Sequence, residues 1–340
     1  HMAVTWWGDD TRRWIERSVR QEGISSFKIY MAYLETVGLQ DDDIVRVLET
    51  TAGLDALVLV HAEQGEEIEI LRDQYFREGM IEPVYHARSR PPEAEGEANV
   101  RIAALAGLTG ANLYVVHVTC RQAVEAIATA QKQGTRIWAE TCPQYLLLDE
   151  SVYELPDFEG ANYVIAPPIR AKEHQEVLWK ALEKGTLQAV GTDHCPFNFK
   201  GQKELGRKDF RLIPGGAAGV ENRLALLYTF GVGRGRIDLH RFVELVSTQP
   251  AKIFGLYPRK GVIAEGSDAD IVIWDPEQTH TIEAATSKSR TDYNVYEGME
   301  VRGWPVRVLL RGKTIVDGDE WLGEAGTGQF LPRTPHAEVL

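Results

Sequence analysis

One stretch of sequence, SFKIYMAY at residues 26–33, decides the fold of this chain. It is short, apolar and partly β-branched and aromatic, which is typical of a buried strand. Lys28 lies in the middle of it, and a buried ammonium is costly unless it is paired or chemically changed. Two interpretations follow. Either the lysine reaches from a strand end to solvent, or its charge is neutralised or converted to that of an anion.

Further apolar runs recur along the chain with helical patterns between them. Strands are predicted at residues 57–61, 113–117, 136–140, 163–166 and 187–191, and helices at residues 95–106, 121–133 and 173–183. Continuous apolar strands that alternate with helices predict a parallel α/β sheet with both faces covered. A doubly wound sheet and a (β/α)8 TIM barrel both fit this alternation.

Polar side chains at the strand ends favour the barrel. Lys28, His61, His117 and Asp193 each lie within or at the carboxyl end of a separate predicted strand. In a barrel these ends converge on one mouth, where barrel enzymes keep their chemistry. Six strands are two short of eight, and nothing after Asp193 supplies two more βα units. The early strands are therefore expected to precede residue 1.

The pattern of the sequence changes at Gly261, where short predicted strands and turn residues begin. A strand is predicted at residues 271–274, and residues 306–310 and 314–316 are expected to form a hairpin. We therefore expect three parts. These are a catalytic barrel domain over residues 1–260, incomplete at its N-terminus, a small β-sandwich-like domain over 261–322, and a C-terminal arm over 323–340.

The charge of the chain limits its partners. Its 37 lysines and arginines are outnumbered by 50 aspartates and glutamates, which gives a net charge of −13. This argues against nucleic acid and anionic membranes, because both attract basic patches. No apolar run approaches the roughly 20 residues of a membrane span. The three cysteines form no CxxC pair, which indicates reduced thiols and a cytoplasmic location.

The polar residues at the strand ends are typical of a metal site. A single histidine at a strand end is more often structural, but His61 and His117 end successive strands and accompany Asp193 and Lys28. Imidazoles and carboxylates are the ligands that zinc prefers in hydrolytic sites. A neutral lysine rarely binds zinc, whereas a lysine carbamylated by CO2 is an anion that can bridge two cations.

Motifs spread over nearly the whole chain resemble those of the dihydropyrimidinase and D-hydantoinase family, the cyclic-amidase branch of the amidohydrolase superfamily. Besides residues 26–33, the matching motifs are VHAE at 60–63, VHV at 116–118, ETCPQYL at 140–146, APPIR at 166–170, GTDH at 191–194, FKGQK at 199–203, PAKIFGLYP at 250–258 and GSDAD at 266–270.

The resemblance implies two divalent metal ions, with zinc expected. Lys28 corresponds to the carbamylated lysine (N6-carboxylysine) that bridges them, and His61 and His117 to the histidines of the second metal. Asp193 corresponds to the aspartate that binds the first metal and takes a proton from the bridging water.

The resemblance also implies a reaction, the opening of a hydantoin or 5,6-dihydropyrimidine ring to the N-carbamoyl amino acid by a hydroxide held between the metals. Tyr33 corresponds to the tyrosine that steadies the oxyanion, and Ala166 and Gly215 to positions whose backbone binds the ring. A structural role is expected for His194. The implied partners are a small cyclic amide and further copies of the chain in a homo-tetramer or dimer, with no nucleic acid or membrane.

One departure from the family pattern concerns the first metal. The family carries a His-x-His pair at the end of the first barrel strand, and His1 is the only histidine here before His61. Relative to the family, roughly 120 N-terminal residues of the barrel are expected to be absent. Allantoinase, dihydroorotase, a non-catalytic scaffold relative and an inactive fragment are the alternatives. The motifs at 140–146 and 200–203 favour the hydantoinase branch.

Overall fold

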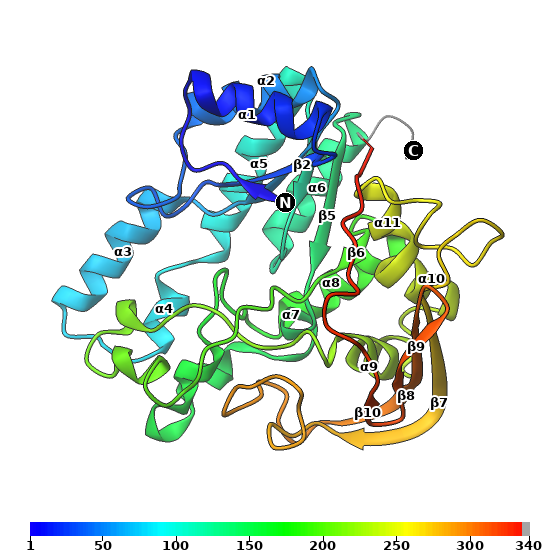
Figure 1. Ribbon diagram of the computed structural model, residues 1–340. Coiled ribbons are helices and arrows are strands. Elements are labelled where there is room, and N and C mark those ends of the chain that lie inside the picture. The colour runs from blue at the N-terminus through cyan, green and yellow to red at the C-terminus, as the bar shows by residue number, and fades with distance from the viewer. Residues whose placement is uncertain (335–340) are drawn as a thin grey trace.

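A parallel sheet forms the centre of the computed structural model, which describes residues 1–334 (Figure 1). Its strands are β1 (Met2–Ala3), β2 (Ser26–Tyr30), β3 (Leu57–His61), β4 (Asn112–Val115), β5 (Ile137–Thr141) and β6 (Ala189–Val190). The six strands lie side by side in sequence order, and every neighbouring pair is parallel. A doubly wound sheet reverses its strand order at a switch point. Because this sheet has no reversal, it is wound in the manner of a barrel.

Helices connect the strands and pack on one another in succession. They are α1 (Asp9–Arg20), α2 (Asp41–Ala52), α3 (Gly65–Arg77), α4 (Val84–Arg88), α5 (Pro92–Thr109), α6 (Arg121–Lys132) and α8 (Glu173–Lys184). Helix α1 contacts α2, α2 contacts α5, α5 contacts α6, and α6 contacts α8. The expected helices at 95–106, 121–133 and 173–183 are confirmed as α5, α6 and α8.

The amphipathic pattern explains why α2 forms. Its buried residues Ile44, Val47, Leu48 and Thr51 recur at the spacing of one helix face. Helix α5 begins with Pro92, whose missing N–H costs nothing in the first turn, and it ends at Gly110 in the left-handed conformation.

The two faces of the sheet bury different clusters. Val58, Val60, Leu113 and Val115 belong to the large core that also contains helix residues such as Ile102. The opposite face carries a smaller apolar cluster made of Leu57, Leu59, Tyr114, Val116, Trp138 and Ile253. The second face corresponds to the interior of a barrel, which is filled by side chains rather than open.

Two strand predictions were wrong. Residues 163–166 form no strand, because the 3-10 helix η2 (Pro156–Tyr163) leads into a segment in which Pro167 and Pro168 cannot donate to a ladder. Strand β1 was missed because two residues carry no readable pattern. The predicted strand 187–191 is reduced to β6. The expected number of strands therefore agrees with the structure, although the set differs.

A second sheet, antiparallel, lies at the lower right of Figure 1. Its strands are β7 (Ile271–Thr281), β8 (Glu300–Leu310), β9 (Lys313–Asp317) and β10 (Glu320–Trp321), in the order β10-β9-β8-β7. The predicted hairpin is confirmed. Arg311 and Gly312 connect β8 to β9 with φ of 49° and 79°, the positive values that a tight two-residue turn requires.

Short helices make up the remaining connections. Between β5 and β6 lie α7 (Pro143–Leu147) and the 3-10 turn η1 (Glu150–Glu154). Between the two sheets lie α9 (Arg223–Leu227), α10 (Leu239–Val243), α11 (Gln249–Ile253), the 3-10 turns η3 (Lys203–Gly206) and η4 (Phe210–Leu212), and the π turns η5 (Tyr228–Val232) and η6 (Glu244–Thr248). Within residues 1–334, no helix combines the length and apolar character needed to span a membrane.

The C-terminal segment returns to the parallel sheet. The Arg333 N–H donates to the Gly23 carbonyl at 2.8 Å, and its guanidinium donates to the Ser26 hydroxyl at 2.7 Å. The predicted arm over residues 323–340 is covered only in part, because residues 335–340 lie outside the described residues.

Candidate metal centre

The strand register places Lys28 on the inner face of the sheet. Lys28 is opposite Leu59 on β3, Leu59 is opposite Tyr114 on β4, and Tyr114 is opposite Trp138 on β5. Residues in one such row face the same side. Because Leu59, Tyr114 and Trp138 form the inner cluster, Lys28 extends that row.

The row one layer nearer the carboxyl ends is polar. Tyr30 is opposite His61, and Glu140 lies two residues beyond Trp138 on β5. The Tyr114 hydroxyl donates to Glu140 Oε2 at 2.9 Å. Burial lowers the pKa of Lys28 to about 8, against the opposing charges of Asp193 and Glu140.

His61 and His117 face each other above this row. His61 Nδ1 lies 3.0 Å from His117 Nε2, and the side chains are 3% and 5% exposed. His61 Nε2 donates to Glu63 Oε2 at 2.7 Å, and the same oxygen accepts from Arg90 at 2.7 Å. Although burial alone raises the pKa of Glu63, the charge of Arg90 and the bond to His61 hold it well below its usual range.

These contacts define which nitrogens are available to a cation. Because Glu63 is a carboxylate, the His61 Nε2 that contacts it carries a proton, and Nδ1 faces His117. Burial, the neighbouring His61 and the charge of Lys28 lower the pKa of His117 well below its usual value, so this ring is neutral. The buried Nδ1 of His117 has no hydrogen-bond partner within the described residues. Two imidazole nitrogens bound to one tetrahedral zinc lie about 3.3 Å apart, so the pair fits one metal ion.

Asp193 follows β6 and lies at the opening of the site. Its side chain is exposed, yet the atoms around it raise the pKa of the carboxyl, while Lys28 and His61 act in the opposite direction. The neighbouring His194 turns away from this role. Its Nδ1 accepts from the N–H groups of Gly219 and Val220 at 3.1 and 3.3 Å.

Tyr33 lies beside the histidine pair. Its ring centroid is 5.2 Å from that of His61, and the Arg90 guanidinium lies 5.4 Å from the ring centre. Burial raises the pKa of Tyr33 to about 12, so its hydroxyl keeps a proton to donate.

Three of the candidate residues have left-handed backbone. Tyr33, His117 and Asp193 have φ of 63°, 44° and 47°. Such conformations are costly for residues with a Cβ, and they cluster at functional sites.

Ala166 and Gly215, the two predicted ring-binding positions, have free peptide groups. Ala166 is half-buried and precedes Pro167 through a cis peptide bond, and Gly215 is exposed. Neither residue forms a hydrogen bond within the part of the chain that the structure describes.

The structure therefore brings His61 and His117 into contact and places Lys28 and Asp193 within electrostatic range of them. Across residues 1–334, no three His, Cys, Asp or Glu side chains gather closely enough to hold a metal ion. Lys28 is the other candidate residue close to the histidine pair, since its charge acts on His117.

Sequence reasoning missed Glu63 and Arg90. Glu63 is part of the motif at 60–63 but received no role, and Arg90 lies outside the motifs. A buried pair of this kind has one available signal, an acidic residue two positions after a ligand histidine on a strand.

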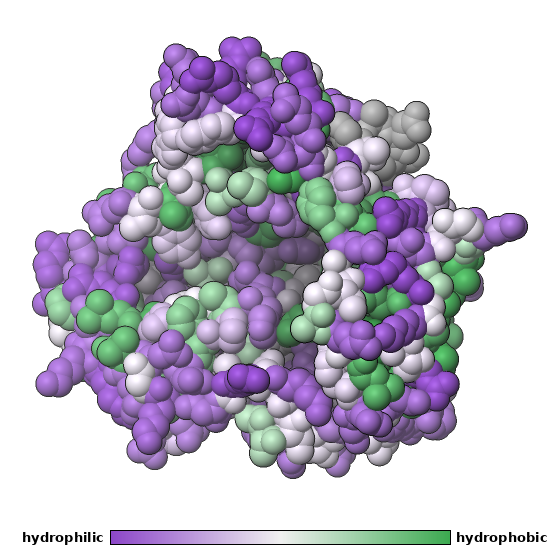
Figure 2. All heavy atoms as spheres, in the orientation of Figure 1, coloured by the Kyte–Doolittle hydropathy of each residue, from purple (hydrophilic) through white to green (hydrophobic). Residues whose placement is uncertain are grey.

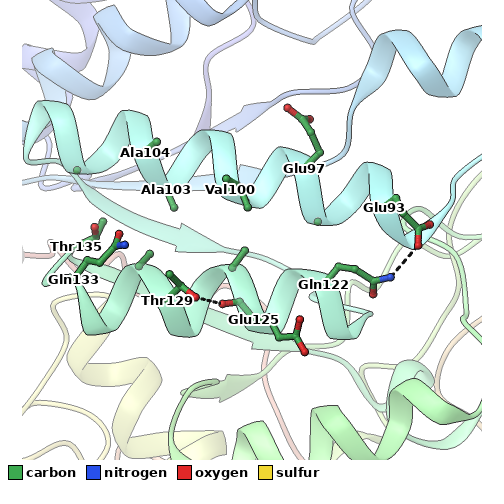
Figure 3. Close-up of a pocket in the computed structure, with 14 residues that line it drawn as sticks. Glu93, Glu97, Val100, Ala103, Ala104, Gln122, Glu125, Thr129, Gln133 and Thr135 are labelled. Atoms are coloured by element: carbon green, nitrogen blue, oxygen red, sulfur yellow. Dashed lines mark hydrogen bonds between the residues drawn. The ribbon is translucent and has the colours of Figure 1, made fainter.

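Figure 2 shows one face hollowed near its middle, close to where Figure 1 places the end of β5 and strand β6. A separate groove of about 670 Å³ lies between α5 and α6 (Figure 3). It is lined by Val100, Ala103 and Glu97 among others and contains none of the candidate site residues, so it is not the metal centre.

Comparison with known proteins assigns the class. A model described as the amidohydrolase family matches residues 11–315. The chain therefore belongs to the amidohydrolase family.

Within this family, the similar proteins include D-hydantoinases and a dihydropyrimidinase. The chain is 48% identical over 340 residues to a D-hydantoinase of Geobacillus stearothermophilus. The match covers all of this chain and 72% of that protein. It is 49% identical over 316 residues to a D-hydantoinase of Ralstonia pickettii, covering 93% of this chain and 69% of that one. The crystal structure of a dihydropyrimidinase from Brevibacillus agri NCHU1002 superposes with a TM-score of 0.98 at 48% identity, covering 99% of this chain and 73% of the other. The predicted resemblance to the dihydropyrimidinase and D-hydantoinase family is confirmed.

Proposed function

We propose that this protein is a metal-dependent cyclic amidohydrolase that opens a hydantoin or 5,6-dihydropyrimidine ring to the N-carbamoyl amino acid. The observation that carries the proposal is the buried pair of His61 and His117, with converging ring nitrogens and a carboxylate behind one of them. Relatives named D-hydantoinase and dihydropyrimidinase support it.

Lys28 completes the centre in this proposal. Its neutral amine attacks CO2, a bond forms between Nζ and the carbon, and the released proton passes to solvent. The lowered pKa of Lys28 raises the fraction of neutral amine near neutral pH. The resulting carbamate, with His61, His117 and Asp193, would hold two divalent ions, for which zinc fits the ligands. When bound, such ions lower the pKa of water and polarise the amide carbonyl.

The remaining steps belong to side chains of the chain itself. Tyr33, protonated because its pKa is raised, donates to the oxygen on which negative charge develops. Asp193, whose carboxyl has a raised pKa, takes a proton from the attacking water and passes it to the leaving ring nitrogen. The free peptide groups of Ala166 and Gly215 bind the N–H and C=O of the ring.

The larger organisation is proposed on the same basis. The six sequence-ordered strands would be part of a (β/α)8 barrel within residues 1–260, and residues 261–322 would form the small β domain. A homo-oligomer in the cytoplasm is the expected state.

Metal analysis tests this function directly. The protein is loaded with zinc in the presence and absence of bicarbonate, and metal content and hydantoin hydrolysis are measured. More bound zinc is expected with bicarbonate than without it, because the carbamate of Lys28 supplies a ligand. Lys28→Ala should lose both metal and hydrolysis, whereas Lys200→Ala, which changes an exposed lysine, should lose neither. Full activity in Lys28→Ala would refute the proposal.

A further inference from the structure

Lys203 has a fully buried amine whose partners are all backbone carbonyls. The residue is 0% exposed, and Nζ donates to Val164 at 2.8 Å, Pro214 at 2.7 Å and Gly216 at 2.8 Å. These three bonds use all the N–H donors of an ammonium. Within the described residues it forms no ion pair with a carboxylate. Burying a lysine in this way is costly, so the contacts it makes need an explanation.

The three carbonyls belong to two segments that no regular sheet holds together. Val164 lies two residues before Ala166, and Pro214 and Gly216 flank Gly215. One direct backbone bond joins the segments, from the Gly216 N–H to the Val164 carbonyl at 3.0 Å. Lys203 adds a connection on each side of Gly215.

The second segment runs directly beside the metal centre. His194 forms a parallel bridge with Ala217, and the Cys195 N–H donates to the Ala217 carbonyl at 3.0 Å. Residues 214–217 therefore lie alongside the chain that follows Asp193. The unbonded peptide groups of Ala166 and Gly215 are thus anchored close to the proposed reaction.

We propose that Lys203 is a positioning residue that sets the spacing between the peptide groups of Ala166 and Gly215 and thereby the ring size that the site prefers. A cyclic amide presents an N–H and a C=O at fixed separation, which differs between a five-membered and a six-membered ring. Two backbone segments with fixed spacing can distinguish them. This inference rests on the proposed function and extends it to substrate choice.

Steady-state kinetics of Lys203→Met, with Lys208→Met as an exposed control from the same loop, test the role. Metal-loaded proteins are assayed on hydantoin and dihydrouracil. Loss of the three hydrogen bonds of Lys203 should raise KM by about tenfold and change kcat by less than about threefold. The reason is that the change affects binding of the substrate in its ground state. The preference between the two rings should shift, and metal content should not change. Lys203→Gln, which keeps two N–H donors, should fall between the wild type and Lys203→Met.

Hydrogen exchange on the unaltered protein covers the case in which Lys203→Met fails to fold. Uracil, whose ring carries the same N–H and C=O pair, should slow exchange at the amides of Ala166 and Gly215 and leave those of α5 unchanged. Absence of this protection overturns the inference. So does a folded Lys203→Met enzyme with reduced stability but unaltered KM and ring preference. A wild-type protein that binds no zinc and opens neither ring contradicts the proposed function instead.

Discussion

Among single residues, Glu63 supports the proposed centre without binding metal in it. Its carboxylate fixes the tautomer of His61 and is itself held by Arg90. A carboxylate behind a ligand histidine orients the ring and makes its free nitrogen a better donor.

Glu63→Gln should weaken zinc binding by about 10- to 100-fold, because the neutral amide no longer fixes the proton on His61 Nε2. Competition with a zinc chelator measures the affinity. Glu66→Gln changes an exposed glutamate at the start of α3 and is the matched control. Equal affinities in the two variants would exclude an orienting role for Glu63.

The buried amine of Lys203 should make stability depend on pH. Burial lowers its pKa from 10.5 to about 7. Between these pH values the unfolded chain binds more protons than the folded one, so stability contributed by this group rises with pH across that window. Urea unfolding of the wild type and Lys203→Met at pH values from about 7 to about 9.5 measures it. The variant should show a smaller rise, and parallel profiles would contradict the assignment.

The candidate ligands could be predicted at the residue scale because strand ends are visible in the sequence. Lys28, His61 and His117 each interrupt or end an apolar run. The contacts that hold the site in place could not be predicted. Arg90 meets Glu63 across 27 residues, and the amine of Lys203 is satisfied by backbone carbonyls, whose position depends on the folded chain and not on side-chain type.

At the scale of elements, two extended segments follow β6, the chain after Asp193 and residues 214–217. Their backbones approach each other closely, which leaves no room for a side chain at one position. Gly216 has φ of 152°, and a Cβ there would lie 2.5 Å from the Cys195 carbonyl. Gly215 has open space around it.

Gly216→Ala should therefore destabilise the protein by about 1–3 kcal/mol, since the strained backbone and the contact with Cys195 both oppose a side chain. Gly215→Ala is the control and should leave the melting temperature almost unchanged. Thermal unfolding of both variants decides the question, and equal melting temperatures would show that the segment relaxes freely.

Prediction of the elements succeeded for long helices, in which the apolar pattern repeats over many residues. It failed for strands that pair over only a few residues. Helices α5, α6 and α8 form where the pattern predicts helices, although α5 extends from Pro92 to Thr109, beyond both predicted ends. The segment at 163–166 is apolar like a strand, but the prolines after it prevent a ladder. Only the folded chain shows that the Val164 carbonyl accepts from Lys203 instead.

At the scale of the whole molecule, metal binding should contribute to stability. A ligand bound only by the folded state stabilises it by about 2.7 kcal/mol at 100 times its dissociation constant. Removal of zinc by a chelator should therefore lower the melting temperature, and zinc with bicarbonate should restore it. Lys28→Ala should show no response to either treatment. A response equal to that of the wild type would place the bound metal elsewhere.

The antiparallel sheet has a consequence for behaviour at high concentration. Strand β7 is paired with β8 on one side, and Val272 and Ile273 on it are each 46% exposed. An open apolar strand edge can recruit the same edge of another molecule and begin aggregation. Here Pro276 and the register shifts on either side of Trp274 interrupt the edge. These interruptions leave only a short apolar run for a neighbouring molecule to extend.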